Sequence, residues 1–338
     1  MKRPTVITSL TLLLIVMGVI SLTLGKYPVT LRDTALFLLA KITGQQQATA
    51  LSMDLLDSLF LSIRLPRVVA AVLVGSSLSV AGAAFQAMFI NPLVSPSLLG
   101  VLAGASFGAA LGMILFKSWL AVQVSTFVFG FISVMVAVGI ARMFKGSAIL
   151  LLILGGVISG AMFTSLLSVV KYCADPYEKL PAIVYWLMGG LSYADAQTVW
   201  ITAVPMVISM IMLVAMSGYL NVLSMGDEEA RALGVPVEKI RLLMIFLASL
   251  VSSLTVVMGG MIGWVGLIIP HISRMLVGPD NKILIPVSIL IGGIYLLLVD
   301  DISRMLFDTE IPIGIVTSLV GIPFFVFVMK KANRGWGS

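Results

Sequence analysis

Long apolar runs separated by short polar stretches recur along the whole chain, and they limit it to a membrane-embedded fold. A helix that crosses a bilayer needs about 20 apolar residues. Ten runs approach that length, at residues 6–24, 66–88, 94–115, 119–141, 148–170, 197–217, 242–262, 264–277, 283–299 and 312–329. Only 11% of the 338 residues are charged, against about a quarter in soluble domains. The pattern predicts an all-α polytopic membrane protein with about ten transmembrane helices, in which residues 1–338 form a single domain.

Three sequence features argue against a cleaved signal peptide, a disulfide and a metal site. The first run has no small-residue cleavage site after it, so we expect a retained helix rather than a signal peptide. Cys173 is the only cysteine, which excludes an intramolecular disulfide and a thiolate metal cluster. The lone His271, in the weakest run, has no partner with which to complete a metal site, and we expect it to bond to a neighbouring helix. The sequence predicts neither a metal nor a cofactor.

The distribution of basic residues predicts the orientation of the chain. With ten spans and both termini inside, 12 of the 21 Lys and Arg residues fall on the inner side and 9 on the outer side, in the direction that the positive-inside rule expects. We therefore expect both termini and the 218–240 loop in the cytoplasm. The net charge of +6 needs no nucleic-acid partner, because the basic residues flank the spans. Arg64, Arg67 and Arg304 lie at outer span edges and oppose the rule, so they require another explanation.

The predicted spans contain no Asp or Glu. Carriers driven by an ion gradient usually need a buried ionisable group. The chain also lacks the Gly-x-x-x-x-Gly-Lys-Ser/Thr loop that binds nucleotide phosphates. Transport against a gradient would thus need energy from another subunit. A stand-alone secondary transporter or channel is the alternative, and a non-transporting scaffold is a third possibility that the broken, glycine-rich interior disfavours.

A charged segment between two apolar runs, residues 225–236, is typical of a short capped surface helix. Asp227 can cap its start, Glu228 and Glu229 suit the positive end of the helix dipole, and Arg231 can pair back along one face. Gly234 suits the helix stop. A membrane protein that keeps such an element on its aqueous face can use it to hold a partner, although an ordinary solvated loop is an equally good interpretation. The candidate contact residues are Gly226, Asp227, Glu228, Glu229, Ala230, Arg231, Leu233 and Gly234.

Small and polar residues within the spans predict helix packing and a possible pathway. Glycines recur every four residues from Gly100 to Gly112, which favours close helix contact. The Asn91-Pro92 and Ser95-Pro96 pairs interrupt helical structure. Because broken backbone at membrane depth must be buried in protein or line a cavity, Gln86, Asn91 and Ser95 are candidate pathway-lining residues.

Six sequence blocks in order resemble the FecCD-type permeases, the membrane subunits of importers for vitamin B12, ferric siderophores, haem and related metal compounds. The blocks extend from about residue 60 to residue 328. They are Arg64-Leu-Pro-Arg67, Asn91-Pro-Leu with Pro96-x-x-Leu-Gly100, Gly226-Asp-Glu-x-Ala-Arg-x-Leu-Gly234, Gly263-x-Val-Gly-Leu-x-x-Pro-His271-x-x-Arg274, Asp300-x-x-x-Arg304, and Glu310-x-Pro-x-Gly-x-x-Thr-x-x-x-Gly-x-Pro-Phe-Phe325.

The resemblance implies a B12-permease-like subunit of the bacterial inner membrane that is not itself an enzyme. Its implied partners are a second copy of the chain, two ATP-binding cassette subunits and a periplasmic binding protein, within membrane lipid. The family's coupling helices match residues 220–240, and its docking arginines match Arg64, Arg67 and Arg304. The alternative for these arginines is pairing with acids of their own chain, such as Asp57, Asp300 or Asp301, or anchoring at lipid headgroups.

Two places depart from the family pattern. Val94-Ser95 replaces the usual alanine and polar residue, and the region of the family's cytoplasmic gate, residues 142–150, has no residue-by-residue match. The cargo implied is a metal chelate or a metal oxyanion. Overall likeness points to the molybdate and tungstate permeases within the family.

Overall fold

The computed structural model describes residues 3–27, 29–43, 52–192 and 194–333, and every regular element in them is helical. The elements are α1 Arg3–Thr23, α2 Leu31–Thr43, α3 Met53–Asp57, the π-helical turn η1 Ser58–Arg64, α4 Leu65–Met88, the 3-10 turn η2 Pro96–Leu99, α5 Val101–Leu115, α6 Trp119–Met143, α7 Ala148–Cys173, α8 Lys179–Leu187, α9 Ala196–Ala215, α10 Ser217–Leu223, α11 Asp227–Ala232, α12 Val237–Gly259, α13 Val265–Val277, α14 Asn281–Met305 and α15 Ile313–Asn333.

The prediction of an all-α polytopic membrane protein is confirmed. Seven helices of the described chain are long and apolar enough to cross a membrane, and three shorter apolar helices, Val101–Leu115, Val265–Val277 and Ile313–Phe327, accompany them. Each of the ten predicted runs coincides with one of these helices. The second run proves to be the end of one continuous 36-residue helix, Met53–Met88, which includes the π-helical turn η1.

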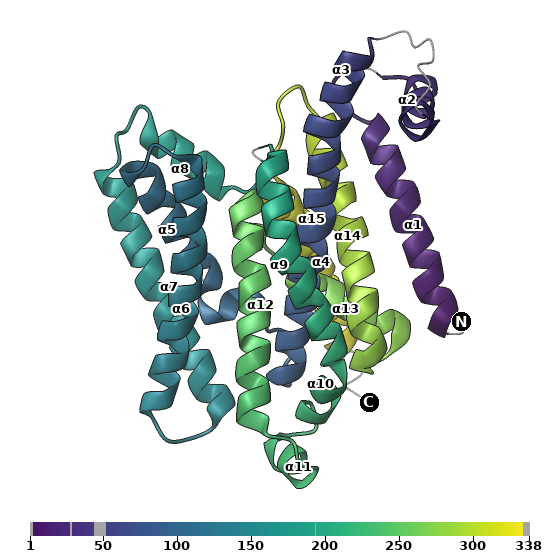
Figure 1. Ribbon diagram of the computed structural model, residues 1–338. Helices are drawn as coiled ribbons and strands as arrows, with labels where there is room; N and C mark the ends of the chain where they lie inside the picture. Colours follow the sequence, from purple (N-terminus) through teal and green to yellow (C-terminus); the bar gives the residue numbers. More distant parts are fainter. Residues whose placement is uncertain (1–2, 28, 44–51, 193, 334–338) are drawn as a thin grey trace.

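The long helices lie roughly parallel, and their connections gather at two ends (Figure 1). We call the end that carries α11 the α11 side and the end that carries α2, α3 and α8 the α2 side. α1 begins and α15 ends toward the α11 side. The terminal residues 1–2 and 334–338 lie outside the described part of the chain, so the predicted location of the termini stays a prediction.

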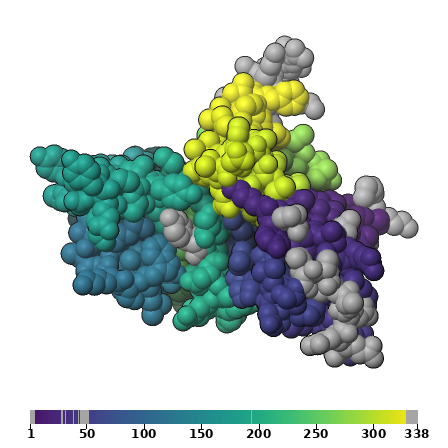
Figure 2. Space-filling view, turned by 90° about the horizontal axis from the view of Figure 1, so that it is seen from above, coloured from purple at the N-terminus to yellow at the C-terminus, as the bar shows by residue number. Residues whose placement is uncertain are grey.

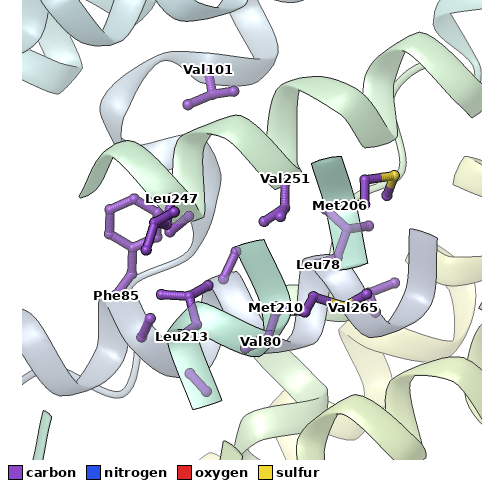
Figure 3. Close-up of a cluster of buried hydrophobic side chains, with 14 of the residues drawn as sticks. Leu78, Val80, Phe85, Val101, Met206, Met210, Leu213, Leu247, Val251 and Val265 are labelled. Carbon is purple, nitrogen blue, oxygen red and sulfur yellow. The ribbon is translucent and has the colours of Figure 1, made fainter. Parts of the chain in front are cut away.

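Helix α4 is the central element, because nearly all its side chains from Pro66 to Met88 are buried. Its apolar residues pack against side chains of α9, α12 and α13 in one continuous core (Figure 3). Phe85 of α4 is fully buried there, as are Met206 and Leu213 of α9 and Val251 of α12.

Glycines allow the helix backbones around this core to approach closely. A Cβ on Gly82 would lie 1.8 Å from the carbonyl oxygen of Gly266 on α13, and one on Gly75 would lie 2.1 Å from that of Gly292 on α14. In the predicted glycine series, Gly104 and Gly108 of α5 meet backbone oxygens of α6 at 2.4 Å in the same way. The interpretation of these glycines as packing residues is therefore confirmed.

Seen from the α2 side, the helices α5–α8 form a lobe on one side of the molecule, and the C-terminal helix α15 projects from the other elements (Figure 2). Large apolar side chains on α15 are exposed, among them Leu319 at 69% and Phe327 at 66%. The segment between α12 and α13 is not helical, and Gly260 and Trp264 in it both have positive φ, at 65° and 70°. A tryptophan is strained in that conformation.

Candidate functional site

The charged segment predicted to hold a partner, residues 225–236, contains the short helix α11, which follows α10 on the α11 side (Figure 1). Gly226 precedes α11 with φ at 121°, and Gly234 follows it with φ at 79°. The amide of Val235 donates to the carbonyl oxygen of Ala230, and the amide of Gly234 donates to that of Arg231. This pair of hydrogen bonds is the Schellman motif, in which a left-handed glycine ends a helix. The predicted helix stop at Gly234 is confirmed.

The start of α11 differs from the prediction. Asp227 is the first residue of the helix rather than its cap, and Gly226 occupies the cap position without a side-chain hydrogen bond. The carboxylate of Asp227 instead forms a two-pronged ion pair with the guanidinium of Arg241 on α12. The prediction that Asp227 pairs with Arg231 is therefore wrong: Arg241 is almost completely buried, and a buried guanidinium requires a carboxylate more strongly than an exposed one does. Hydrogen bonding to Arg241 lowers the pKa of the Asp227 carboxyl.

One face of α11 packs against the protein and the other is exposed. Ala230 is fully buried, whereas Leu233 is 62% exposed. Glu228, Glu229 and Arg231 are exposed as well. The exposed face thus combines two acids, a base and a large apolar side chain, which is the composition that suits a protein contact.

The sequence predicted a second site at the outer arginines, and Arg67 lies there at the centre of a buried ion cluster on the α2 side. Its guanidinium donates to both carboxylate oxygens of Asp300 on α14, at 3.0 to 3.1 Å, and to both of Glu310 at 3.0 Å. Ser192 donates to Glu310 at 2.6 Å. Burial alone would raise the pKa of Glu310, but the hydrogen bonds from Arg67 and Ser192 outweigh it and lower that pKa. Arg67 thereby joins α4, α14 and the loops that flank α9 and α15.

Arg304 completes the ion cluster. Its Nε lies 3.2 Å from a carboxylate oxygen of Asp300, and its Nη2 pairs with Asp301 and donates to Ser21 at 2.9 Å. Ser21 in turn donates to Asp301 at 2.6 Å. Asp300 is fully buried, Asp301 and Arg304 are each 6% exposed, and these residues fix the end of α1 to the end of α14.

Arg64 satisfies backbone carbonyls at the end of α1. It donates to the oxygens of Leu22, Thr23 and Tyr27 at 2.8, 3.3 and 2.7 Å. The last four carbonyls of a helix have no partner within the helix and favour a positive charge. Arg64 provides both a donor and that charge for α1.

Two sequence predictions need correction here. The structure brings the three arginines to one end of the molecule, but their side chains are largely buried rather than free for a binding protein. Arg67 and Arg304 pair with Asp300 and Asp301 of their own chain, as the alternative interpretation expected. The statement that no acid falls within a span is also wrong, because α14 continues to Met305 and includes Asp300 and Asp301. Both carboxylates are tolerated there because arginines neutralise them.

The three candidate pathway residues lie at the end of α4 and just after it. Gln86 is buried and contacts α13, accepting from Arg274 and donating to the carbonyl oxygen of Leu267, both at 3.3 Å. Asn91 forms a turn by accepting from the amide of Leu93 at 2.9 Å, and the Ser95 hydroxyl bonds that of Ser97 at 2.6 Å. The predicted break in the helix is present. A role for these residues in lining a pathway stays a prediction.

The structure also shows a candidate region that sequence reasoning missed. A cavity of about 370 Å³ is lined by the α12–α13 segment together with the end of α8 and the start of α15, including Met188, Met261, Trp264 and Ser318. No charged side chain lines it. The only sequence signal was the density of glycines around residue 260. His271 on α13 contacts α15 through its ring, which lies 6.5 Å from that of Phe324 in an edge-to-face arrangement. Within the described residues its side chain makes this ring contact rather than the predicted hydrogen bond to a neighbouring helix.

The FecCD transport family model matches residues 13–331, which is nearly the whole chain. The chain belongs to the FecCD family. The molybdate import system permease protein MolB of Haemophilus influenzae is 40% identical over 333 residues, which cover 98% of this chain and 97% of the relative. A probable iron chelatin transport system permease protein of Helicobacter pylori is 36% identical, with 82% and 84% covered.

A solved metal-chelate type ABC transporter in an inward-facing conformation has the same fold. Its chain superposes with a TM-score of 0.84 at 37% identity, covering 98% of this FecCD chain and 100% of the other. The resemblance inferred from the six sequence blocks is thereby confirmed, and the chain is a multi-pass ABC permease.

Proposed function

We propose that this chain is the membrane-spanning subunit of a binding-protein-dependent ABC importer that carries a metal chelate or a metal oxyanion. The observation that carries the proposal is the α11 element, a capped helix on the aqueous side of the bundle with an exposed mixed face. Family membership supports it, and the names of the relatives support the class of cargo.

An ATPase bound to the exposed face of α11 would move the transmembrane helices through fixed contacts. Ala230 packs inside the protein, and the Asp227–Arg241 ion pair joins the start of α11 to the start of α12. The Schellman motif at Gly234 fixes the direction in which the chain leaves α11. A displacement of α11 therefore transfers to α12 with little loss.

The outer arginines would act in docking of the binding protein through the ion cluster. Of the three, Arg67 has a partner at the surface, because the side chain of Glu310 is 28% exposed. A carboxylate of the binding protein would compete with Glu310 for Arg67, since a guanidinium bonds carboxylates through two parallel hydrogen bonds. Arg64 and Arg304 would contribute by holding the ends of α1 and α14 in place.

The stand-alone carrier has to be weighed again because Asp300 and Asp301 are buried. A coupling carboxylate in a carrier must exchange a proton or a cation during the cycle. Asp300 is instead held by two arginines at the end of α14, at 3.0 and 3.2 Å. A carboxylate with two cationic partners is a structural group, and this favours the ATP-driven importer.

The remaining assignments follow from the same proposal. The α11 side would face the cytoplasm with both termini, and the α2 side would face the periplasm. The chain would act in the bacterial inner membrane as a homodimer with two ATPase subunits, the pathway lying between the copies, and residues 220–240 would bind the ATPase.

The test is uptake in proteoliposomes that contain the chain with its ATPase and binding protein. We expect uptake of a metal compound that requires ATP, and no uptake by the chain alone. Asp227→Asn should uncouple ATP hydrolysis from uptake, whereas Glu228→Gln removes an equal charge from the exposed face and tests contact with the ATPase alone. Gradient-driven uptake by the chain without ATPase would refute the proposal.

A further inference from the structure

The side chain of Asn221 on α10 is bonded to the start of α14, 59 residues further along the chain. Its amide nitrogen donates to a carboxylate oxygen of Asp280 at 2.8 Å, and its amide oxygen accepts from the backbone amide of Asn281, also at 2.8 Å. The same carboxylate oxygen of Asp280 accepts from the backbone amide of Lys282 at 3.1 Å. The function proposed above does not use this junction of α10 with α14.

The chemistry of a helix start makes the junction specific. The first four backbone amides of a helix have no partner within the helix. Asp280 satisfies one of them from the cap position of α14, and Asn221 satisfies a second one from another helix. Asn281 is 4% exposed, so water has little access to replace Asn221. The hydrogen bond to the carboxylate of Asp280 is charge-assisted and therefore one of the stronger kinds. α10 is thereby fixed to the start of α14.

The other end of α14 belongs to the ion cluster. Asp300 pairs with Arg67 at 3.0 Å and with Arg304 at 3.2 Å. The 25 residues of α14 extend over about 37 Å at 1.5 Å per residue, between the α11 side and the α2 side (Figure 1). One helix thus carries side-chain bonds both to the segment proposed to bind the ATPase and to the arginine proposed to meet the binding protein.

Close contacts with α4 support α14 between its two ends. The hydroxyl of Ser76 donates to the carbonyl oxygen of Ile289 at 2.9 Å. A Cβ on Gly292 would lie 2.1 Å from the hydroxyl oxygen of Ser79 and 2.4 Å from the carbonyl oxygen of Gly75. Close-packed interiors compress little and transmit strain. A displacement of α14 at one end is therefore carried, together with α4, to the other end.

Docking of a binding protein would give the ion cluster a second state. In the structure Arg67 is shared between Asp300 and Glu310, and both oxygens of each carboxylate accept from it. A carboxylate of the binding protein that replaces Glu310 would link Asp300, through Arg67, to the partner instead of to its own chain. Any movement of Arg67 in that exchange would shift Asp300 and with it the end of α14.

We propose that α14 transmits the docking of the binding protein to the ATPase, and that Asn221 is the positioning residue at which α10 and α11 receive the displacement. Asn221 touches neither cargo nor nucleotide in this scheme and acts through Asp280 and Asn281. The inference rests on the proposed function, which assigns the binding protein to one end of α14 and the ATPase to the segment at the other end.

The test is ATP hydrolysis by the full chain assembled with its ATPase in proteoliposomes, measured with and without the binding protein. The readout is the ratio of the two rates, because a loss of folded or assembled protein lowers both rates equally and leaves the ratio unchanged. Asn221→Asp keeps an acceptor for the Asn281 amide, but it removes the donor and places a second carboxylate against Asp280, where like charges repel. We expect the ratio to fall at least about twofold, the lower limit of what single residues change in coupling networks.

Exchange of the two side chains should restore the ratio. With Asn221→Asp and Asp280→Asn together, the donor lies on α14 and the acceptor on α10, so the hydrogen bond forms again in the opposite direction. Asparagine also caps a helix as well as aspartate does. Lys282→Gln is the matched control, because the side chain of Lys282 is exposed at the same junction and only its backbone amide bonds Asp280. Its ratio should equal that of the unaltered chain.

The inference and the proposed function fail in different ways. An unchanged ratio in Asn221→Asp would overturn the inference, as would an exchange variant that is no better than the single variant. An equal loss in Lys282→Gln would show that any change at the junction disturbs hydrolysis, and would overturn it too. The proposed function is judged by ATP-dependent uptake. An unaltered complex that takes up a metal compound with ATP but is not stimulated by the binding protein would overturn the inference and leave the importer in place.

Discussion

Replacement of Asp300 by asparagine separates the two mechanisms of transport most sharply. Asp300 is fully buried and lies 3.0 Å from a nitrogen of Arg67 and 3.2 Å from one of Arg304. Asparagine has nearly the same shape but no charge. The substitution therefore leaves the packing of α14 unchanged and leaves two buried guanidinium groups short of one carboxylate.

The expected loss of stability is large. Two unit charges 3 Å apart attract by roughly 5 kcal/mol at an effective dielectric of 20, before desolvation is subtracted. Measured costs of removing one partner of a buried ion pair are about 3–5 kcal/mol. The remaining acids, Asp301 and Glu310, each already have an arginine, so they cannot compensate fully. With an unfolding entropy of about 2.1 cal/mol/K per residue, the melting temperature of this chain should fall by roughly 4–7 °C.

The assay is thermal unfolding of the purified chain in detergent, compared with Asp54→Asn as an exposed acid on the same side. Asp54→Asn should leave the melting temperature unchanged. Combining Asp300→Asn with Arg67→Gln removes one charge of each sign and restores the charge balance of the unaltered chain, so the double variant should be more stable than the sum of the single effects by about 1 kcal/mol or more. A stable Asp300→Asn protein that has lost transport would refute the structural role and favour a carrier with Asp300 as its coupling site.

Four further outcomes are expected. Gly234→Val should uncouple ATP hydrolysis from uptake, because φ at 79° disfavours a β-branched residue; Gly139→Val, where open space surrounds a helical glycine, should not. Asp227→Asn should lower the melting temperature at pH 5–7. The difference should shrink as the pH falls below about 4, because the pKa of Asp227 is lower in the folded than in the unfolded chain, and the stability that its ionised form contributes is lost when the carboxyl is protonated. A cysteine at the exposed Leu233 in a Cys173→Ser background should resist impermeant reagents applied from the periplasm; labelling would overturn the topology. Gly82→Val should prevent folding, since even a Cβ would meet the Gly266 oxygen at 1.8 Å, and a folded variant would contradict this.

The spans and the end of α11 could be predicted because their signals are local. An apolar run of about 20 residues in lipid forms a helix, because its backbone N–H and C=O groups must form hydrogen bonds within the segment itself. Gly234 likewise follows a polar, helix-favouring run directly, so the helix stop needs no distant contact. Both predictions depended on residues within one element.

The side-chain partners could not be predicted in this way. Arg67 meets Asp300 and Glu310 across 233 and 243 residues of sequence, and nothing near Arg67 indicates these acids. Asp227 pairs with Arg241 rather than with Arg231, which is nearer in the sequence, because the guanidinium of Arg241 is buried. The sequence does not show that burial. The end of α14 was placed before Asp300 because charges normally end an apolar span, and only the facing arginines make the longer helix possible.

The contacts divide the molecule into parts that can and cannot move in a transport cycle. α4, α13 and α14 touch backbone to backbone at Gly75, Gly82 and their partners, and contacts of 1.8 to 2.1 Å to an added Cβ leave no room for sliding. The ion cluster fixes the α2-side end of the same group. On the α11 side, by contrast, α6 and α7 are separated from α12 by a cavity of about 290 Å³, and α12 is the helix that Arg241 ties to α11. A displacement of α11 is therefore resisted by the closely packed helices α4, α13 and α14. The cavity between α12 and the helices α6 and α7 leaves room for movement on the other side. The lobe of α5–α8 is the part that an ATPase acting at α11 would displace.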